Sequence, residues 1–220
     1  MPAALSGRPP PVVRRRDRQR ADGDARRVGG ARMPDLRGWR RSFPVRRESI
    51  AHLRAGVRCW VTMHARPARP EDAAGVARIY NQGIADRTAT FETRPRTASD
   101  ISTWFDDAHP LLVVEEEGAV VAFAATFPYR PRACYAGIAE ASVYVDRAFR
   151  RHGAGRLALE SLIAAAAAAG FWKLVSRVFV ENTASRRLVA SVGFREVGIY
   201  EKHGQLDGVW HDVVIVEKLL

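Results

Sequence analysis

Cysteine is scarce in this sequence, and long apolar runs are absent. Its 220 residues include two cysteines, Cys59 and Cys134, too few for a disulfide framework or for a zinc site built on paired cysteines. No stretch approaches the roughly 20 apolar residues that a membrane-spanning helix needs, and prolines and arginines interrupt the first apolar residues where a secretory signal would lie. We therefore expect a cytoplasmic protein that binds neither a metal ion nor a membrane.

Lysine is missing from residues 1–62, whereas arginine is abundant there. This segment holds 16 arginines and 5 acidic residues, so its net charge of +11 equals that of the whole chain. Residues 63–220 hold 19 basic and 19 acidic residues and are neutral overall. Because residues 1–62 show no period of 2 or 3.6, we expect a disordered extension followed by one folded domain over 63–220. A start of translation at Met63 and a basic arm that binds nucleic acid are alternative interpretations of this segment.

From Met63 onward, apolar residues recur at the spacings of helices and strands. Helices are predicted over four segments: 70–84, 97–108, 155–169 and 183–192. Strands are predicted over seven segments: 64–66, 111–116, 119–127, 138–145, 172–180, one beginning at 193, and 209–219. Helices alternate with strands and a hairpin turn falls at Gly118, so the fold class is α/β with a mixed sheet.

The segment Arg-Arg-His-Gly-Ala-Gly at 150–155 lies between a predicted strand and a predicted helix. Glycines let backbone N–H groups approach an anion closely, and a helix N-terminus adds partial positive charge. We therefore expect the segment to bind phosphate, with a plain strand-to-helix turn as the alternative. Arg156 and Leu157 follow where a nucleoside-triphosphate loop has Lys and Ser or Thr. A dinucleotide loop is also excluded, because it needs a third glycine and precedes any hairpin.

The strand predicted over 138–145 has two unlike faces, since alternate residues of a strand share a side. One face is small and apolar and should pack on helices: Ala139, Ala141, Val143 and Val145. Glu140 belongs to the opposite face, which should line a cleft. A carboxylate there could take a proton from an amine, although an ordinary solvated glutamate is the alternative.

The phosphate-binding segment resembles the Arg/Gln-x-x-Gly-x-Gly/Ala loop of the GCN5-related N-acetyltransferases (GNAT), and the order of elements is similar to that family's. The resemblance covers residues 63–220 and narrows to the phosphinothricin-acetyltransferase-like branch, with the greatest likeness to its arsinothricin N-acetyltransferases. Four stretches carry it: IYNQGIADRTATFET (79–93), YRPRACYAGIAEASVYV (129–145), ENTASRRLVASVGF (181–194) and KHGQLDGVWHDVVIVEKLL (202–220). The resemblance implies a GNAT fold with helices on both sides of a mixed sheet, acetyl-CoA as co-substrate, no metal, and a homodimer.

The resemblance also implies roles for particular residues. Glu140 becomes the general base. The strand at 138–145 is expected to diverge from its neighbour and to leave backbone groups for the pantetheine arm. Contacts to acetyl-CoA are expected from Val143, Tyr144, Val145, Arg150, Arg151, His152, Gly153, Ala154, Gly155, Arg156, Asn182 and Ser185. Contacts to the substrate are expected from Phe91, Glu92, Tyr129, Arg130, Arg132, Tyr135 and Lys202. Asn182 also suits a helix cap, which is compatible with the first role.

Two features of the sequence bear on the substrate. Arg130 and Arg132 place two guanidinium groups close together, which suits a carboxylate plus a second oxyanion such as a phosphinate or arsinate; ordinary surface charge is the alternative. Val189 stands where the branch often has a histidine, which leaves Glu140 as the clear base. Cys134 is expected to be a packed thiol and not a nucleophile.

The leading hypothesis is acetyl-CoA-dependent N-acetylation of the α-amino group of a small anionic amino acid analogue, an activity that would give resistance to such compounds. Within the same class, the alternatives are another small amine or a protein N-terminus. In other classes, the alternatives are a CoA-binding regulatory domain without catalysis and a nucleic-acid-binding protein that uses the basic arm. No nucleic-acid contact is expected of the folded domain itself.

Overall fold

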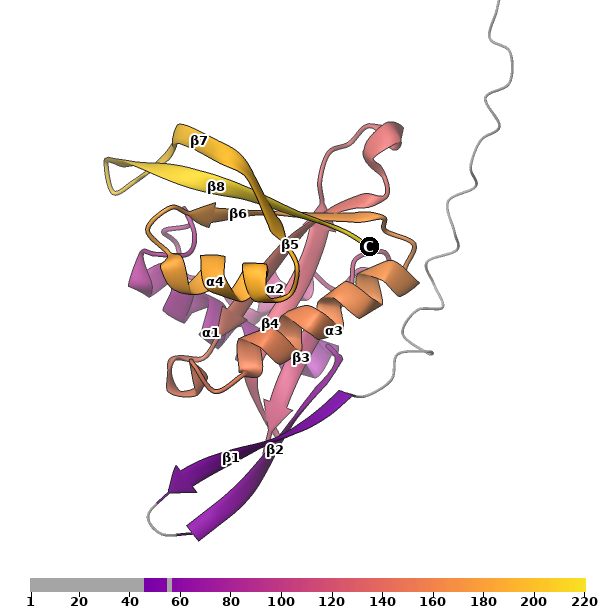
Figure 1. The fold of residues 1–220 in the computed structure, drawn as a ribbon, viewed down its shortest axis with the longest axis vertical. Helices are drawn as coiled ribbons and strands as arrows, with labels where there is room; N and C mark the ends of the chain where they lie inside the picture. The colour runs from indigo at the N-terminus through magenta and orange to yellow at the C-terminus, as the bar shows by residue number, and fades with distance from the viewer. Residues whose placement is uncertain (1–45, 55–56) are drawn as a thin grey trace, which may run out of the picture. The chain divides into compact units, whose positions relative to one another are not determined.

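The computed structural model describes the backbone of residues 46–54 and 57–220, with side chains from Thr62 onward (Figure 1). Its elements follow in this order: β1 (Arg46–Arg54), β2 (Val57–Pro67), η2 (Pro70–Asp72), α1 (Ala73–Asp86), α2 (Ala98–Ser102), β3 (Leu111–Glu116), β4 (Ala119–Pro128), η3 (Ala133–Tyr135), β5 (Ile138–Val145), η4 (Arg147–Phe149), α3 (Ala154–Ala168), β6 (Lys173–Phe179), α4 (Thr183–Ser191), β7 (Arg195–Leu206) and β8 (Val209–Leu219). From β2 onward, this order confirms the predicted succession of helices and strands.

The described strands form one sheet in the order β1-β2-β3-β4-β5-β6-β8-β7. Neighbouring strands are antiparallel except β5 and β6, which run parallel and are joined through α3. The prediction of a mixed sheet is therefore confirmed. Because β5 and β6 run parallel, their carboxyl ends point to the same edge of the sheet, where a ligand can approach both strands.

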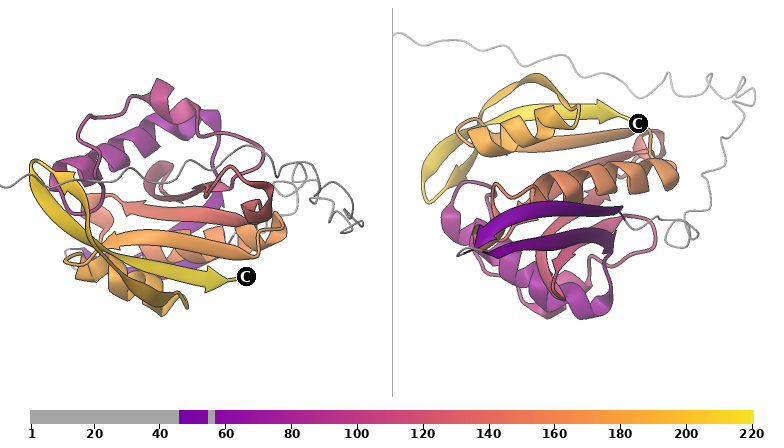
Figure 2. Two further views of the ribbon diagram at one scale, coloured as in Figure 1. Left: turned by 90° about the horizontal axis from the view of Figure 1, so that it is seen from above. Right: turned by 60° about the horizontal axis from the view of Figure 1, so that its bottom comes forward.

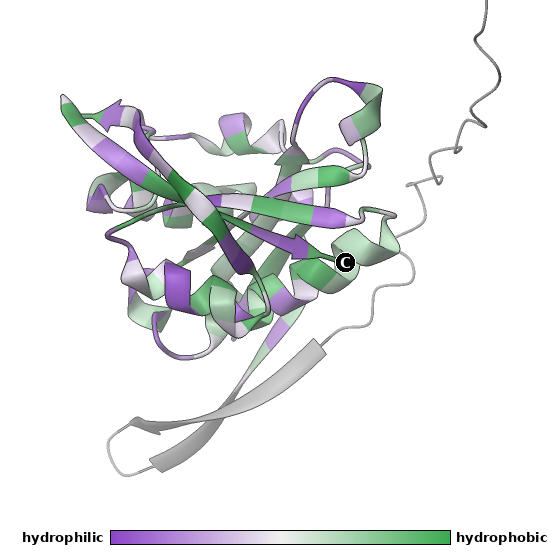
Figure 3. Ribbon diagram, turned by 45° about the horizontal axis from the view of Figure 1, so that its top comes forward, coloured by the Kyte–Doolittle hydropathy of each residue, from purple (hydrophilic) through white to green (hydrophobic). Residues whose placement is uncertain are grey.

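Helices cover both faces of the sheet, and the strand residues alternate between two cores. Leu112 and Val114 of β3 pack with α3, whereas Leu111 and Val113 of the same strand pack with α1. Figure 2 shows the two helical layers on either side of the strands. In Figure 3 the apolar positions concentrate in α3 and the central strands, while β7 and β8 carry many polar ones. The alternation of β3 residues between the two cores is the arrangement expected of a strand that is buried on both faces.

Two expectations differ from the structure. The helix predicted over 97–108 ends at Ser102, because the Asp106 carboxylate accepts hydrogen bonds from the next backbone N–H groups, Ala108 and His109, and turns the chain. Cys134, expected to be packed, is exposed in η3. The boundary predicted after residue 62 stays a prediction; β2 begins before it, at Val57, and pairs with β1. Residues 1–45 and 55–56 of the predicted extension lie outside the described residues.

A buried ion pair joins β2 to the start of α1. The guanidinium of Arg66 donates to both carboxylate oxygens of Asp72 at 2.7 and 2.8 Å and to Glu115 at 2.8 Å. Burial alone raises the pKa of Asp72, but the hydrogen bonds from Arg66 and from the Arg69 N–H, with the positive charge of both arginines, outweigh it and lower the pKa below its usual 3.8. The ionised carboxylate therefore stabilises the fold.

We expect Asp72→Asn to lower the free energy of unfolding by about 2 kcal/mol at neutral pH, because a charged hydrogen-bond partner of a buried guanidinium is lost. The pKa of Asp72 is depressed in the folded state, so its contribution is present above the unfolded-state pKa and is lost as pH falls through the folded-state pKa. Urea denaturation should therefore show a gap between wild type and variant at pH 7 that narrows below about pH 4. Asp207→Asn, at an exposed pair with Arg87, is the control. A gap that is constant with pH would contradict this account.

Candidate active site

The parallel strands β5 and β6 pair over only part of their length. Their register runs from Ile138↔Lys173 to Glu140↔Val175 and stops there, although β5 continues to Val145 and β6 to Phe179. Residues 141–145 pair with β4 on one side, but their backbone groups that point to the other side have no β6 partner, as the expected divergence of the two strands requires. An opening between strands that leaves backbone N–H and C=O groups unpaired by the sheet offers them to a ligand.

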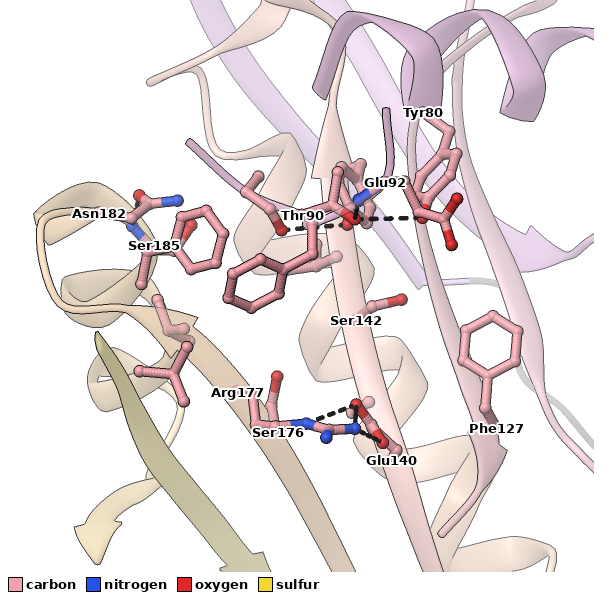
Figure 4. A pocket seen from close by; sticks show the side chains of 18 of the residues that line it. Tyr80, Thr90, Glu92, Phe127, Glu140, Ser142, Ser176, Arg177, Asn182 and Ser185 are labelled. Carbon is pink, nitrogen blue, oxygen red and sulfur yellow. Dashed lines mark hydrogen bonds and ion pairs between the residues drawn. The ribbon is translucent and has the colours of Figure 1, made fainter. Parts of the chain in front are cut away.

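A cavity of about 580 Å³ lies where the strands part (Figure 4). It is lined from β5 by residues 140–144, from β6 by residues 176–179, and from the segment after α1 by residues 89–94. α4 contributes its N-terminal residues Asn182 and Ser185, and β7 contributes His203. The sheet, one helix end and one loop thus converge on a single space of the size usual for small-molecule sites.

Glu140 lines this cavity, on the face of β5 that the sequence assigned to it. Its carboxylate is held by Arg177 of β6, whose Nε donates to Oε1 at 3.1 Å and whose Nη2 donates to both oxygens (Figure 4). The side chains are 46% exposed for Arg177 and 29% for Glu140, so the pair can be reached from solvent. Arg177 was not among the residues that sequence analysis selected.

The predicted phosphate-binding segment is exposed at Arg151, His152 and Gly153. Arg151 and Gly153 take left-handed φ angles of 64° and 85°, and α3 begins at the buried Ala154. The first hydrogen bond of the helix runs from Leu157 N–H to the Gly153 carbonyl at 3.0 Å. The N–H groups of 154–156 therefore have no acceptor inside the helix and face the turn, which is the arrangement that binds an anion.

Gly155 lies where two neighbouring side chains come close, and it has no positive φ angle. A Cβ at this position would lie 3.0 Å from Val145 Cγ2 and 3.1 Å from Leu188 Cδ2. These contacts bring the start of α3 against the end of β5 and against α4. The predicted phosphate-binding segment is thus held beside the opening between β5 and β6.

Two of the basic residues expected to contact acetyl-CoA have protein partners. Arg150 donates to Asp86 at 2.6 Å and to the Val145 carbonyl, and Arg156 donates to Glu160 at 2.9 Å. Burial raises the pKa of Asp86, but hydrogen bonds from Arg147 and Arg150 outweigh it and lower that pKa below its usual value. Arg150 therefore fastens the segment to α1.

Asn182 serves as the N-cap of α4, as one of its two predicted roles requires. Its side-chain oxygen accepts from Ser185 N–H at 3.0 Å, and its amide nitrogen donates to the Thr88 carbonyl at 2.9 Å. Asn182 and Ser185 both line the cavity. Val189, two turns from the helix start, lines it as well and is buried in the core with α3, so no ionisable group stands at that position.

The residues predicted to contact the substrate divide into two groups. Phe91 and Glu92 line the cavity, and Phe91 packs so closely on β7 that a Cβ at Gly204 would lie 2.9 Å from its ring. The remaining residues do not belong to the cavity lining: Tyr129, Arg130, Arg132, Tyr135 and Lys202. Arg130 stacks on the Tyr129 ring at 5.3 Å, and both arginines are exposed on the segment between β4 and β5. Hydrogen bonding with Tyr129 raises the pKa of Arg130, so it stays charged.

An aromatic cluster forms the wall of the cavity beside α1. Tyr144 stacks on Phe123 at 5.3 Å and meets Tyr80 edge-on at 4.9 Å, and its hydroxyl donates to the Ala89 carbonyl. Burial raises the pKa of the hydroxyl of Tyr144, and also that of Tyr80, so both stay neutral. The cluster holds the segment after α1 against β5 and keeps that side of the cavity apolar.

Among residues 62–220, whose side chains are described, no group of three or more metal-binding side chains comes together. Within the described part of the chain, no helix is long and apolar enough to cross a bilayer. The ionisable side chains that line the cavity are those of Glu92, Glu140, Arg94, Arg177 and His203, with two aromatic hydroxyls on Tyr80 and Tyr144.

Known proteins are similar to this chain in sequence and in fold. Residues 75–194 match the model of the acetyltransferase (GNAT) family. The phosphinothricin N-acetyltransferase of Streptomyces viridochromogenes is 34% identical over 67% of this chain and 82% of its own length. An L-methionine sulfoximine/L-methionine sulfone acetyltransferase of Pseudomonas paraeruginosa is 31% identical over 69% of this chain and 91% of its own.

Solved structures agree with the sequence relatives. A GNAT superfamily phosphinothricin acetyltransferase from Sinorhizobium meliloti, crystallised in complex with acetyl-CoA, superposes with a TM-score of 0.67 at 26% identity, over 71% of this chain and 87% of that one. The predicted GNAT fold and the predicted acyltransferase class are confirmed. With the diverging strands, the exposed turn before α3 and relatives above 30% identity, the chain belongs to the acetyltransferase (GNAT) family, in its phosphinothricin-acetyltransferase-like branch.

Proposed function

We propose that this protein transfers the acetyl group of acetyl-CoA to the α-amino group of a small anionic amino acid analogue of the phosphinothricin, arsinothricin or methionine sulfoximine type. The observation that carries the proposal is the Glu140 carboxylate in the cavity where β5 and β6 part. Relatives that acetylate phosphinothricin and methionine sulfoximine support the substrate class.

The described residues fit acetyl-CoA. The turn at Arg151–Gly153 and the N–H groups of 154–156 would hold its diphosphate, and the backbone groups of 141–144 that point to the β6 side would bond its pantetheine amides. Bound acetyl-CoA supplies the acetyl group as a thioester. A backbone N–H of β5 would donate to the thioester carbonyl, and one such preorganised donor lowers the barrier by roughly 3–4 kcal/mol.

The chain would supply the base but no nucleophile. Glu140 would take one proton of the substrate ammonium, directly or through a water molecule, so that the neutral amine attacks the thioester carbonyl itself. As the C–N bond forms and the C–S bond breaks, CoA would leave as a thiolate and take up the second proton that the nitrogen loses. Cys134 is exposed and does not belong to the cavity lining, so it would form no acetyl-enzyme. The Val189 side chain can neither accept nor donate a proton, which leaves the role of base to Glu140. We further propose that Arg130 and Arg132 attract the anionic substrate to the rim of the site and that the protein is a homodimer.

An activity screen tests the proposal. Acetyl-CoA consumption should be measured with phosphinothricin, arsinothricin, L-methionine sulfone and L-methionine sulfoximine, beside a tetrapeptide with a free N-terminus and a polyamine. We expect turnover of at least one amino acid analogue and none of the polyamine. Turnover of the peptide alone would identify a protein N-terminus as the substrate and contradict the proposal.

A further inference from the structure

Arg177 is hydrogen-bonded to the carboxylate of Glu140, which the proposed reaction needs as a base. An ionised carboxylate has about four acceptor positions. Three hydrogen bonds from Nε and Nη2 of Arg177 end on the two oxygens of Glu140. With this pair closed, little room is left for Glu140 to accept a proton from an amine.

Arg177 stands on the same side of the sheet as Glu140. On β6, Leu174 and Val178 are buried against the α3 side, so Arg177 points to the other face, where Phe179 packs with Phe91. The pair spans the place where β5 and β6 part, because the last paired residues are Glu140 and Val175. A ligand that enters between the strands on this face meets both members of the ion pair.

The cavity offers few other cations. Among its described lining residues, the basic ones besides Arg177 are Arg94 and His203. Arg94 belongs to an ion pair with Asp100 at 3.5 Å. Arg130 and Arg132, which sequence analysis selected for the anion, do not line the cavity. A guanidinium fork in contact with the base is therefore placed for an anion next to the amine.

We propose that Arg177 binds the α-carboxylate of the substrate and that this exchange frees Glu140. The inference rests on the proposed function and narrows its substrate class to amines with a carboxylate on the same carbon. In an α-amino acid the nitrogen and the carboxylate carbon are both bonded to Cα, at about 1.46 and 1.52 Å. Such a zwitterion is complementary to an ion pair: its carboxylate replaces Glu140 on Arg177, and its ammonium replaces Arg177 on Glu140.

Binding measurements with a matched pair of probes test the exchange. The probes are L-methionine sulfone and its carboxamide, which carry the same ammonium and differ in the carboxylate. Titration calorimetry in the presence of CoA gives the ratio of their Kd values for each variant. We expect wild type to prefer the carboxylate by about tenfold or more, Arg177→Met to lose that preference, and Arg177→Lys to recover part of it.

Glu140→Gln provides an opposite expectation. Without the internal carboxylate, Arg177 gives up only a neutral amide oxygen, which is a weaker partner, so the preference for the carboxylate probe over the carboxamide should increase. Loss of the ammonium contact affects both probes equally and cancels in the ratio. A merely structural role for Arg177 would leave the ratio unchanged in both variants.

The outcomes separate this inference from the proposed function. If Arg177→Met keeps the preference, or Arg132→Met abolishes it while Arg177→Met does not, the assignment of Arg177 is wrong even if acetyl transfer occurs. If the preference depends on Arg177 but acetyl-CoA is not consumed, the carboxylate site stands and the transferase proposal fails. If wild type binds L-methionine sulfone and its carboxamide with equal Kd values, the inference is overturned directly.

Discussion

Glu140→Gln should lower kcat by about 10²- to 10⁴-fold, the usual contribution of a positioned general base. Glutamine keeps the size of the side chain and can still hydrogen-bond to Arg177, but it cannot accept the proton of the ammonium. Because the phosphate-binding turn and the unpaired backbone of β5 are untouched, the Kd of acetyl-CoA should stay within about twofold of wild type. Steady-state kinetics with phosphinothricin or L-methionine sulfone and calorimetry with acetyl-CoA measure the two quantities.

Glu196→Gln is the matched control, since Glu196 is also held by an arginine, Arg186, with hydrogen bonds of 2.9 and 3.1 Å. It does not belong to the cavity lining, so its loss should leave kcat unchanged. A Glu140→Gln enzyme with at least half the wild-type kcat would exclude Glu140 as the base. A CoA-binding regulatory domain without catalysis has no turnover to lose. Wild-type turnover that Glu140→Gln abolishes, while the variant still binds acetyl-CoA, would therefore exclude that role.

Arg151→Glu should raise KM for acetyl-CoA by about 10- to 100-fold, because a charge-assisted contact to phosphate is replaced by repulsion. Arg151 is exposed in the turn that precedes α3, and its φ of 64° directs the chain so that the N–H groups of 154–156 face the turn. The amine site is formed by other residues, so KM for the amine should change little. Raising the salt concentration should weaken wild-type binding of acetyl-CoA more than that of the variant.

Arg69→Glu is the control for charge reversal, because Arg69 is also exposed and stands before a helix, at the start of η2. It should change neither KM. Equal increases of both KM values in Arg151→Glu would indicate a general disturbance of the site and contradict a diphosphate contact at this turn.

Local pattern was enough to predict most elements of the fold. The apolar run at 111–116 and the alternating residues of 138–145 each predicted a strand, and the structure confirms both. Helix ends were harder: the helix predicted over 97–108 stops early because the Asp106 side chain competes for backbone N–H groups. Strand β1 was missed, since pairing with β2 through backbone hydrogen bonds needs no apolar period.

The candidate site was predicted unevenly, and Arg177 shows the reason. In the segment KLVSRVF a single arginine among apolar residues was the available signal, but nothing near it in sequence indicates a partner. Glu140 lies 37 positions away and meets it across the parallel strands. For Arg130 and Arg132 the reverse holds. Their spacing predicted an anion site, but they lie on the segment between β4 and β5 and do not belong to the cavity lining.

The sequence by itself determined the charge division at residue 62, the order of elements from β2, the turn before α3 and the face of β5 that carries Glu140, because each depends on neighbours a few positions apart. Only the tertiary structure decided where β5 and β6 part, which arginine meets the base, and which aromatic residues line the cavity. Those features depend on strand register and on contacts between distant segments, and register is set by packing of the whole sheet and not by the composition of one strand.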